Sequence, residues 1–279
     1  MRNVRRRRTP TWILILPYLS LAAALPGCGP RNRPGSGEVS RHTELANAYA
    51  AFEQRQYDQA MAGADRVLSE DSVGPGSAEA LYLKGRIEEQ KAKDAGNTSQ
   101  ARDHLREARA IYQRALAIKP AQPLEAYLRA GLANASYFLE DYATAAREWA
   151  AAYPQINDAD AKAWVLYRAG LSEQRQGRFA EADRHFATVQ QLFPGSEQAR
   201  RAATHQGAAG FYVQVGTFAT NANADNTAGM LKAQGYTAVK ATDPSGRQSI
   251  AVGPVPTYQQ AKSLRDRLVA QYPGAMIVP

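Results

Sequence analysis

The chain has 279 residues, enough for two ordinary domains, and its 44% hydrophobic and 22% charged residues exclude a wholly disordered chain. The formal net charge of +8 is unevenly placed: residues 1–27 hold five arginines and no acid, residues 209–279 hold six basic and three acidic residues, and residues 28–208 are neutral. This division leaves no basic stripe of the kind that binds nucleic acid, so we expect no nucleic-acid partner.

Residues 1–27 predict a signal peptide. They read MRNVRRRRTPTWILILPYLSLAAALPG: basic residues come first, then an apolar segment of about fifteen residues, then small residues. The apolar segment is shorter than the roughly 20 residues that cross a bilayer as a helix, and Pro17 and Pro26 interrupt it. We therefore expect export rather than a membrane-spanning helix.

Cys28 is the only cysteine, so it has no partner in the chain for a disulfide or a zinc site. The run Leu25-Pro26-Gly27-Cys28 resembles the lipobox of bacterial lipoproteins, from which Pro26 departs. The resemblance implies cleavage before Cys28 and membrane contact through a lipid on it; an ordinary signal peptide or an uncleaved anchor is the alternative.

Residues 28–41 are rich in Pro, Gly and Ser, which predicts a flexible tether between the lipid and a folded body. Gly29 stands where many lipoproteins of the inner membrane carry an aspartate. The lipoprotein resemblance therefore implies a bacterial cell envelope location, lipid-anchored in the outer membrane and facing the periplasm.

Residues 42–206 predict a helical array. Four stretches place alanines and aromatic residues at helical spacing, beginning near residues 57, 108, 142 and 177. They resemble the tetratricopeptide repeat (TPR), in which small residues let paired helices approach closely and aromatic residues fill the gaps. The resemblance implies about four units and a groove that holds a protein or peptide partner; a mere spacer is the alternative. The run KAKDAGNTSQA predicts a lengthened turn between the helices of the second unit.

Nothing in the array indicates catalysis. His42, His104, His185 and His205 are scattered without the spacing of metal ligands, and the acid pair at residues 88–89 is typical of a solvated helix face. The chain also has no phosphate-binding loop or serine-histidine-aspartate order. We expect a protein that is not an enzyme and that needs no cofactor or metal.

After THQGAAG (residues 204–210) the hydrophobic period changes from helical to two. The pattern predicts strands over 211–218, 236–241, 249–255 and 275–278, and helices over 225–234 and 258–272. The βαββαβ order is the split ferredoxin-like arrangement, with both helices on one sheet face and the other face open. The predicted fold class is therefore multidomain α+β: an all-α TPR-like superhelix followed by a ferredoxin-like domain.

The runs FYVQVGTF and IAVGP, with Gly235-Tyr236 between them, resemble the SPOR domain over residues 209–279. That family binds peptidoglycan glycan strands from which the peptides have been removed, so the resemblance implies the same ligand here. Strand alternation turns Val213 and Val215 toward the helices and leaves their neighbours on the open face. The residues predicted to contact glycan are Tyr212, Gln214, Gly216, Thr217, Arg247, Ser249 and Ala251.

Gln214 is the strongest candidate, because an amide both donates to and accepts from sugar hydroxyl and acetamido groups. For Tyr212 and Gln214 the alternative is a purely structural role on the strand. Gly216 and Gly253 each follow a valine, and we expect them to permit a bulge or a close backbone approach.

Together these observations predict an envelope lipoprotein that binds glycan through residues 209–279 and a partner protein through its helical groove. Such a protein acts as a localisation or scaffold factor in cell-wall or division processes, because two tethers raise each other's effective concentration. The alternative is an outer-membrane assembly or envelope scaffold lipoprotein, in which the helical array does the main work and the sheet is a weak accessory.

Overall fold

The computed structural model describes residues 36–242 and 246–279, which form two compact units, one ending at Pro120 and the other running from Ala121 to Pro279. The predicted signal peptide and Cys28 lie outside the described residues, and the predicted segment boundaries stay predictions. No helix among the described residues is both long and apolar enough to cross a membrane.

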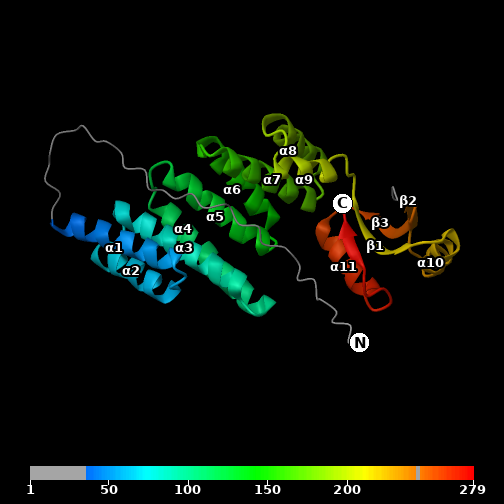
Figure 1. Ribbon diagram of the computed structural model, residues 1–279, viewed down its shortest axis with the longest axis horizontal. Helices are drawn as coiled ribbons and strands as arrows, with labels where there is room; N and C mark the ends of the chain where they lie inside the picture. Colours follow the sequence, from blue (N-terminus) through cyan, green and yellow to red (C-terminus); the bar gives the residue numbers. More distant parts are fainter. Residues whose placement is uncertain (1–35, 243–245) are drawn as a thin grey trace, which may run out of the picture. The chain divides into compact units, whose positions relative to one another are not determined.

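The first unit is built from two helix pairs (Figure 1). They are α1 (Ser36–Glu53) with α2 (Tyr57–Glu70), and α3 (Pro75–Asp94) with α4 (Thr98–Ala117). Ala60 and Ala64 of α2 are fully buried and share a core with Leu83 and Ile87 of α3. The small side chains allow the helices to approach closely, as the TPR resemblance implies. Helix α1 starts at Ser36, within the segment predicted as a tether.

The insertion in the second predicted unit lengthens helices and not the turn, so the prediction of a long turn was wrong. Helices α3 and α4 have 20 residues each, and only residues 95–97 separate them. Lys91, Ala92 and Lys93 are good helix formers, and Ala92 is buried. Asn97 then starts the next helix by accepting a hydrogen bond from the Gln100 backbone amide.

The acid pair at residues 88–89 is buried, contrary to the prediction of a solvated face. Glu88 lies 2.7 Å from the His104 ring nitrogen Nδ1, and Glu89 accepts a 3.0 Å hydrogen bond from the Tyr112 hydroxyl. Buried carboxylates require such partners. The extra helical length brings α3 and α4 side by side, which supplies these partners.

Two helix glycines face large aromatic rings, one pair in each unit. A Cβ at Gly85 would overlap the Tyr112 ring, and a Cβ at Gly170 would lie 2.7 Å from Cε1 of Phe186. Tyr112 and Phe186 are both fully buried. The missing glycine side chain therefore makes room for the ring of the following helix, as the repeat pattern indicates.

The second unit begins with five further helices and a short 3-10 turn. They are α5 (Leu124–Phe138), α6 (Tyr142–Ala152), η1 (Tyr153–Gln155), α7 (Ala159–Arg175), α8 (Phe179–Leu192) and α9 (Glu197–His205). Asp141, Asp158 and Ser196 cap α6, α7 and α9 by accepting backbone hydrogen bonds. Helix α9 closes the helical part by covering the hydrophobic core around Phe186.

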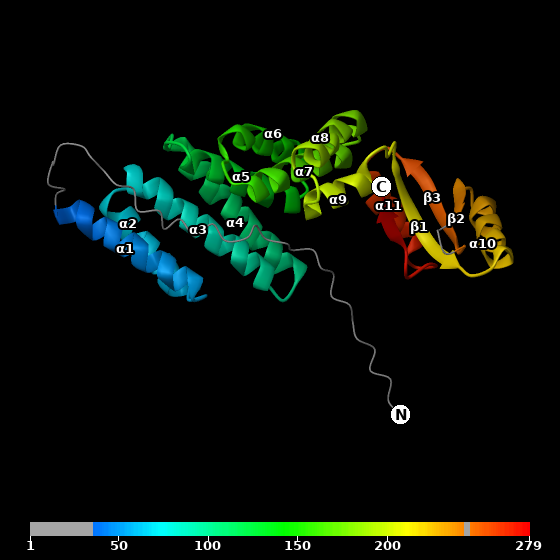
Figure 2. The same cartoon turned by 45° about the horizontal axis from the view of Figure 1, so that its top comes forward.

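The sheet follows in the predicted βαββαβ order. Its elements are β1 (Phe211–Phe218), α10 (Asn221–Ala233), β2 (Ala238–Thr242), β3 (Gln248–Val255), α11 (Tyr258–Leu268) and β4 (Met276–Val278). The strands are antiparallel in the order β2-β3-β1-β4, and the two helices pack against this sheet (Figures 1 and 2). The structure confirms the fold class: TPR-like helices followed by an α+β domain with four antiparallel strands.

The sheet domain also packs against the preceding helices, which the sequence did not indicate. The Phe211 ring lies 5.5 Å from that of Phe179 on α8, and the Tyr258 ring lies 6.2 Å from that of Tyr142 on α6. Lys262 of α11 forms an ion pair with Glu140. Aromatic contacts and one ion pair therefore fasten α11 and β1 to the last helices of the array.

Candidate functional site

The open face of the sheet lies opposite α10 and α11. Val213, Val215, Ile250 and Val252 are buried beneath these helices, as strand alternation predicts. Their neighbours Tyr212, Gln214, Ser249 and Ala251 are partly exposed. The two central strands, β1 and β3, therefore carry most of the predicted contact residues.

The two Val-Gly sequences mark two irregularities in the β1–β3 pairing. One falls between Gln214 and Gly216, and the other lies opposite Phe211 to Val213, where β3 contains Gly253. Gly253 has φ +148°, and a Cβ there would lie 2.8 Å from the Phe211 carbonyl oxygen, so glycine is required. The expectation of a bulge or close approach at each glycine is confirmed.

The bulge in β1 changes which residues lie on the open face. Gly216 pairs with the buried Ile250, and Thr217 pairs with Ser249. Simple alternation had placed Gly216 on the open face, and this placement was wrong because the extra residue shifts the alternation by one. Thr217 takes the outward position instead.

The shift produces a polar cluster of three side chains. The Gln214 amide Nε2 donates a 3.1 Å hydrogen bond to the Thr217 hydroxyl, and the Thr217 and Ser249 hydroxyls are 3.1 Å apart. Their mutual bonds fix the orientation of the Gln214 amide, so its carbonyl oxygen is directed away from Thr217. The cluster offers donors and acceptors without any charged group.

A row of paired residues crosses the sheet through Gln214 and has an exposed apolar side chain at each end. Ala251 pairs with Val239 of β2 and with Gln214 of β1, and Gln214 pairs in turn with Met276 of β4. Val239 is 41% exposed and Met276 54% exposed. Sequence reasoning missed both residues, although the buried Val213 pairs with Ile277 and thereby turns Met276 outward. Within the row, Ala251 contributes only a small side chain.

The remaining predicted residues lie around this surface. Tyr212 pairs with Val278 at one end of β1, and its ring lies against Gly253, where an added Cβ would be 2.9 Å from Cδ1. Arg247 is exposed and lies immediately before β3, two positions ahead of Ser249. The structure thus brings Gln214, Thr217, Ser249 and Ala251 together, with Tyr212 and Arg247 at the margins. Their role in binding stays a prediction.

A family model identifies the domain that carries this surface. The model of the SPOR domain matches residues 207–279. These residues are a SPOR domain. No curated protein matches the chain.

Across the described residues, no group of three His, Cys, Asp or Glu side chains is placed to hold a metal ion.

Several solved structures, TPR proteins among them, resemble the chain at low sequence identity. YrrB, a TPR protein with an unusual peptide-binding site, has a TM-score of 0.47 at 20% identity, with 60% of this chain and 79% of YrrB covered. MamA has a TM-score of 0.47 at 16% identity, with 62% of this chain and 85% of MamA covered. PilF of Pseudomonas aeruginosa has a TM-score of 0.44 at 15% identity, with 85% of this chain and 94% of PilF covered.

Proposed function

We propose that the protein binds peptide-free glycan strands of peptidoglycan through the open face of its SPOR domain. The observation that carries the proposal is the uncharged cluster of Gln214, Thr217 and Ser249, with exposed apolar side chains on the two outer strands, Val239 on β2 and Met276 on β4. Glycan without stem peptides presents hydroxyl and acetamido groups, which an amide and two hydroxyls can bind. The acetamido methyl groups find an apolar partner in Val239 and Met276.

Sedimentation with purified sacculi tests this proposal. The full chain is expected to co-sediment with amidase-treated sacculi, whose glycan lacks peptides, and less with untreated sacculi. Digestion of the glycan to soluble fragments should release the protein. Equal, weak sedimentation with both preparations would contradict glycan binding.

Gln214→Ala is expected to weaken binding to amidase-treated sacculi about fivefold. The change removes one amide that both donates and accepts, and one such neutral interaction is worth roughly 1 kcal/mol. Gln259→Ala is the matched control, because Gln259 is exposed on α11 and its side chain faces away from the sheet surface. Unchanged affinity of the Gln214 variant at unchanged melting temperature would remove this residue from the site.

We further propose that the TPR-like helices bind a partner protein, so that the molecule acts as a localisation or scaffold factor in cell-wall or division processes. Docking of the SPOR domain on α6 and α8 supports a single scaffold carrying both surfaces. The alternative is an envelope assembly lipoprotein in which the SPOR domain is accessory. Deleting residues 207–279 should abolish localisation in the first case and leave it intact in the second.

A lipid on Cys28, anchoring the protein to the outer membrane, is part of the proposal. Cys28→Ser is expected to abolish labelling by a radioactive or clickable fatty acid and to move the protein from the membrane fraction to the soluble fraction. Cys28→Ala should behave in the same way. Unchanged membrane retention without label would point to an uncleaved N-terminal anchor instead.

A further inference from the structure

Three arginines of the second unit gather around aromatic rings on α5 and α7. The guanidinium of Arg168 lies 5.3 Å from the ring centres of Tyr137 and Phe138 and 5.6 Å from that of Trp164. Arg201 of α9 lies 5.3 Å from the same Trp164 ring. Arg175, two helical turns beyond Arg168 on α7, has its guanidinium 4.6 Å from the ring centre of Tyr137. We call Arg168, Arg175 and Arg201 the arginine cluster.

Among the described residues, Arg168 has no acidic partner. Its guanidinium contacts aromatic rings instead. Arg175 donates a 2.9 Å hydrogen bond to the Tyr142 hydroxyl, and only Arg201 is paired, with Glu197 at 2.5 Å. Other arginines of this unit do have carboxylate partners; they are Arg129, Arg147, Arg178 and Arg184. The arginine cluster therefore carries more positive charge than its surroundings neutralise.

The environment makes this charge costly. Burial, together with the nearby Arg175 and Arg201, lowers the pKa of Arg168 below its ordinary value. Burial and Arg175 likewise lower the pKa of His205 to about 4, so His205 is neutral at neutral pH and the charge comes from arginines. A half-buried guanidinium beside like charges gains most from an anionic partner, because the surrounding medium screens it less than water does.

We propose that Arg168 and Arg201 bind a carboxylate of an acidic peptide segment in a partner protein. A guanidinium presents parallel N–H groups that match the two oxygens of a carboxylate, and the Trp164 and Phe138 rings hold the two arginines in place. The adjoining rings also give apolar peptide side chains a surface to pack on. This inference rests on the proposed partner-binding role of the helices, and it names the chemistry of that partner.

Selection from a library of random twelve-residue peptides tests the proposal on the full chain. Peptides retained by the wild-type protein are expected to be enriched in Asp and Glu relative to the library. The most enriched peptide, labelled with fluorescein, then gives a dissociation constant by anisotropy. Selection without acidic enrichment would overturn the proposal.

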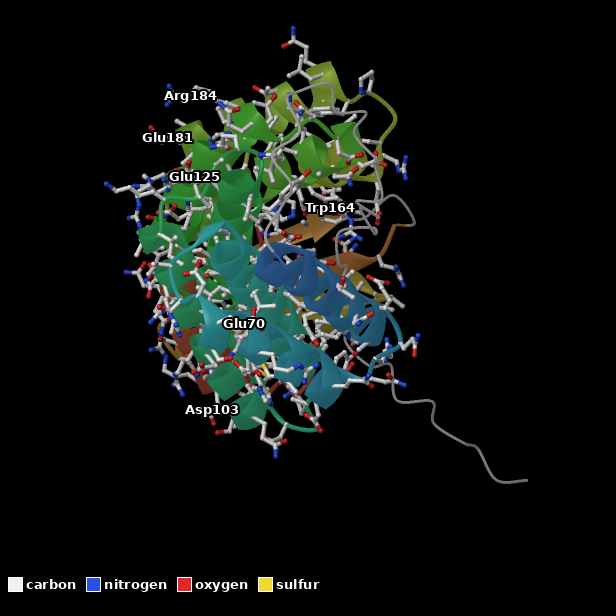
Figure 3. All side chains as sticks on the ribbon, turned by 90° about the vertical axis from the view of Figure 1, so that its left-hand side faces the viewer. Glu70, Asp103, Glu125, Trp164, Glu181 and Arg184 are labelled. Carbon is white, nitrogen blue, oxygen red and sulfur yellow. The ribbon has the colours of Figure 1, made fainter. Side chains whose placement is uncertain are left out.

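Arg168→Gln is expected to weaken binding of that labelled peptide about 10- to 100-fold, the range for a lost charge-assisted hydrogen bond. Arg184→Gln is the matched control: it removes the same charge, but Arg184 pairs with Glu181 on α8, on the side of the helices away from Trp164 (Figure 3). Its affinity should stay within about twofold of wild type, since exposed pairs contribute little.

Arg201→Gln provides a second variant, in case Arg168→Gln lowers the melting temperature. This variant should also weaken binding of the labelled peptide, and it leaves the contacts of Arg168 with Tyr137 and Phe138 in place. Full affinity in both variants would overturn the proposal. Sedimentation with amidase-treated sacculi should be unchanged in both, so failure here is distinct from failure of glycan binding.

Discussion

Phe186→Ala is expected to lower the free energy of unfolding of the second unit by about 3–5 kcal/mol. Phe186 is fully buried between α7 and α9, with its ring 6.1 Å from that of Tyr167 and 5.6 Å from that of His205. Its removal leaves a cavity that the close-packed helices cannot fill. Trp149 and Trp164 both belong to this unit, so urea unfolding followed by tryptophan fluorescence measures the change.

Gly170→Ala separates this packing from a general loss of stability. As a single substitution, it should lower the free energy of unfolding by about 1–3 kcal/mol, because the new Cβ would lie 2.7 Å from the Phe186 ring. In the Phe186→Ala background the ring is gone and only the His185 Cβ, at 3.1 Å, stays close, so the same change should lower the free energy of unfolding much less. Gly229→Ala in α10, where nothing lies within 4 Å, should stabilise by about 0.5–1 kcal/mol. Additive effects of Gly170→Ala and Phe186→Ala would contradict the proposed fit.

Features that depend on residues close in sequence could be predicted. Gly170 and Phe186 belong to one helix pair, so their spacing already indicates that a small residue faces a large ring. The alternation of Val213 and Val215 likewise fixes the buried face of β1, since side chains of a strand alternate between faces. These local patterns account for the helical repeats, the order of the sheet elements and the placement of Gln214.

The rest of the site depends on positions that local patterns do not report. A bulge shifts alternation by one residue, so Thr217 reaches the open face although its parity in the sequence says otherwise. Met276 is placed by pairing with a strand more than sixty residues away. The insertion after residue 90 reads as a turn in isolation, but packing of α3 against α4 keeps it helical. The contact of Tyr258 with the helical repeats could not be predicted from the sequence, because each residue in this contact also matches the hydrophobic pattern of its own domain.

Tyr258→Ala is expected to loosen the SPOR domain from the helices and to lower the free energy of unfolding by about 2–3 kcal/mol. The Tyr258 ring lies 4.1 Å from the Arg175 guanidinium and 5.7 Å from the Phe211 ring, so it is the centre of the contact. Tyr258→Phe keeps these ring contacts and should change stability by less than about 0.5 kcal/mol.

Limited proteolysis gives the second measurement of this docking. The segment at residues 206–210 joins α9 to β1, and a protease should cut it faster in Tyr258→Ala than in Tyr258→Phe or wild type, because local opening exposes it. Arg175 contacts Tyr258 on the SPOR side and Tyr137 on the side of the arginine cluster. Loss of Tyr258 therefore frees one side of Arg175, and peptide affinity should change together with the rate of cleavage. Equal cleavage of all three proteins would mean that the aromatic contact does not hold the two parts together.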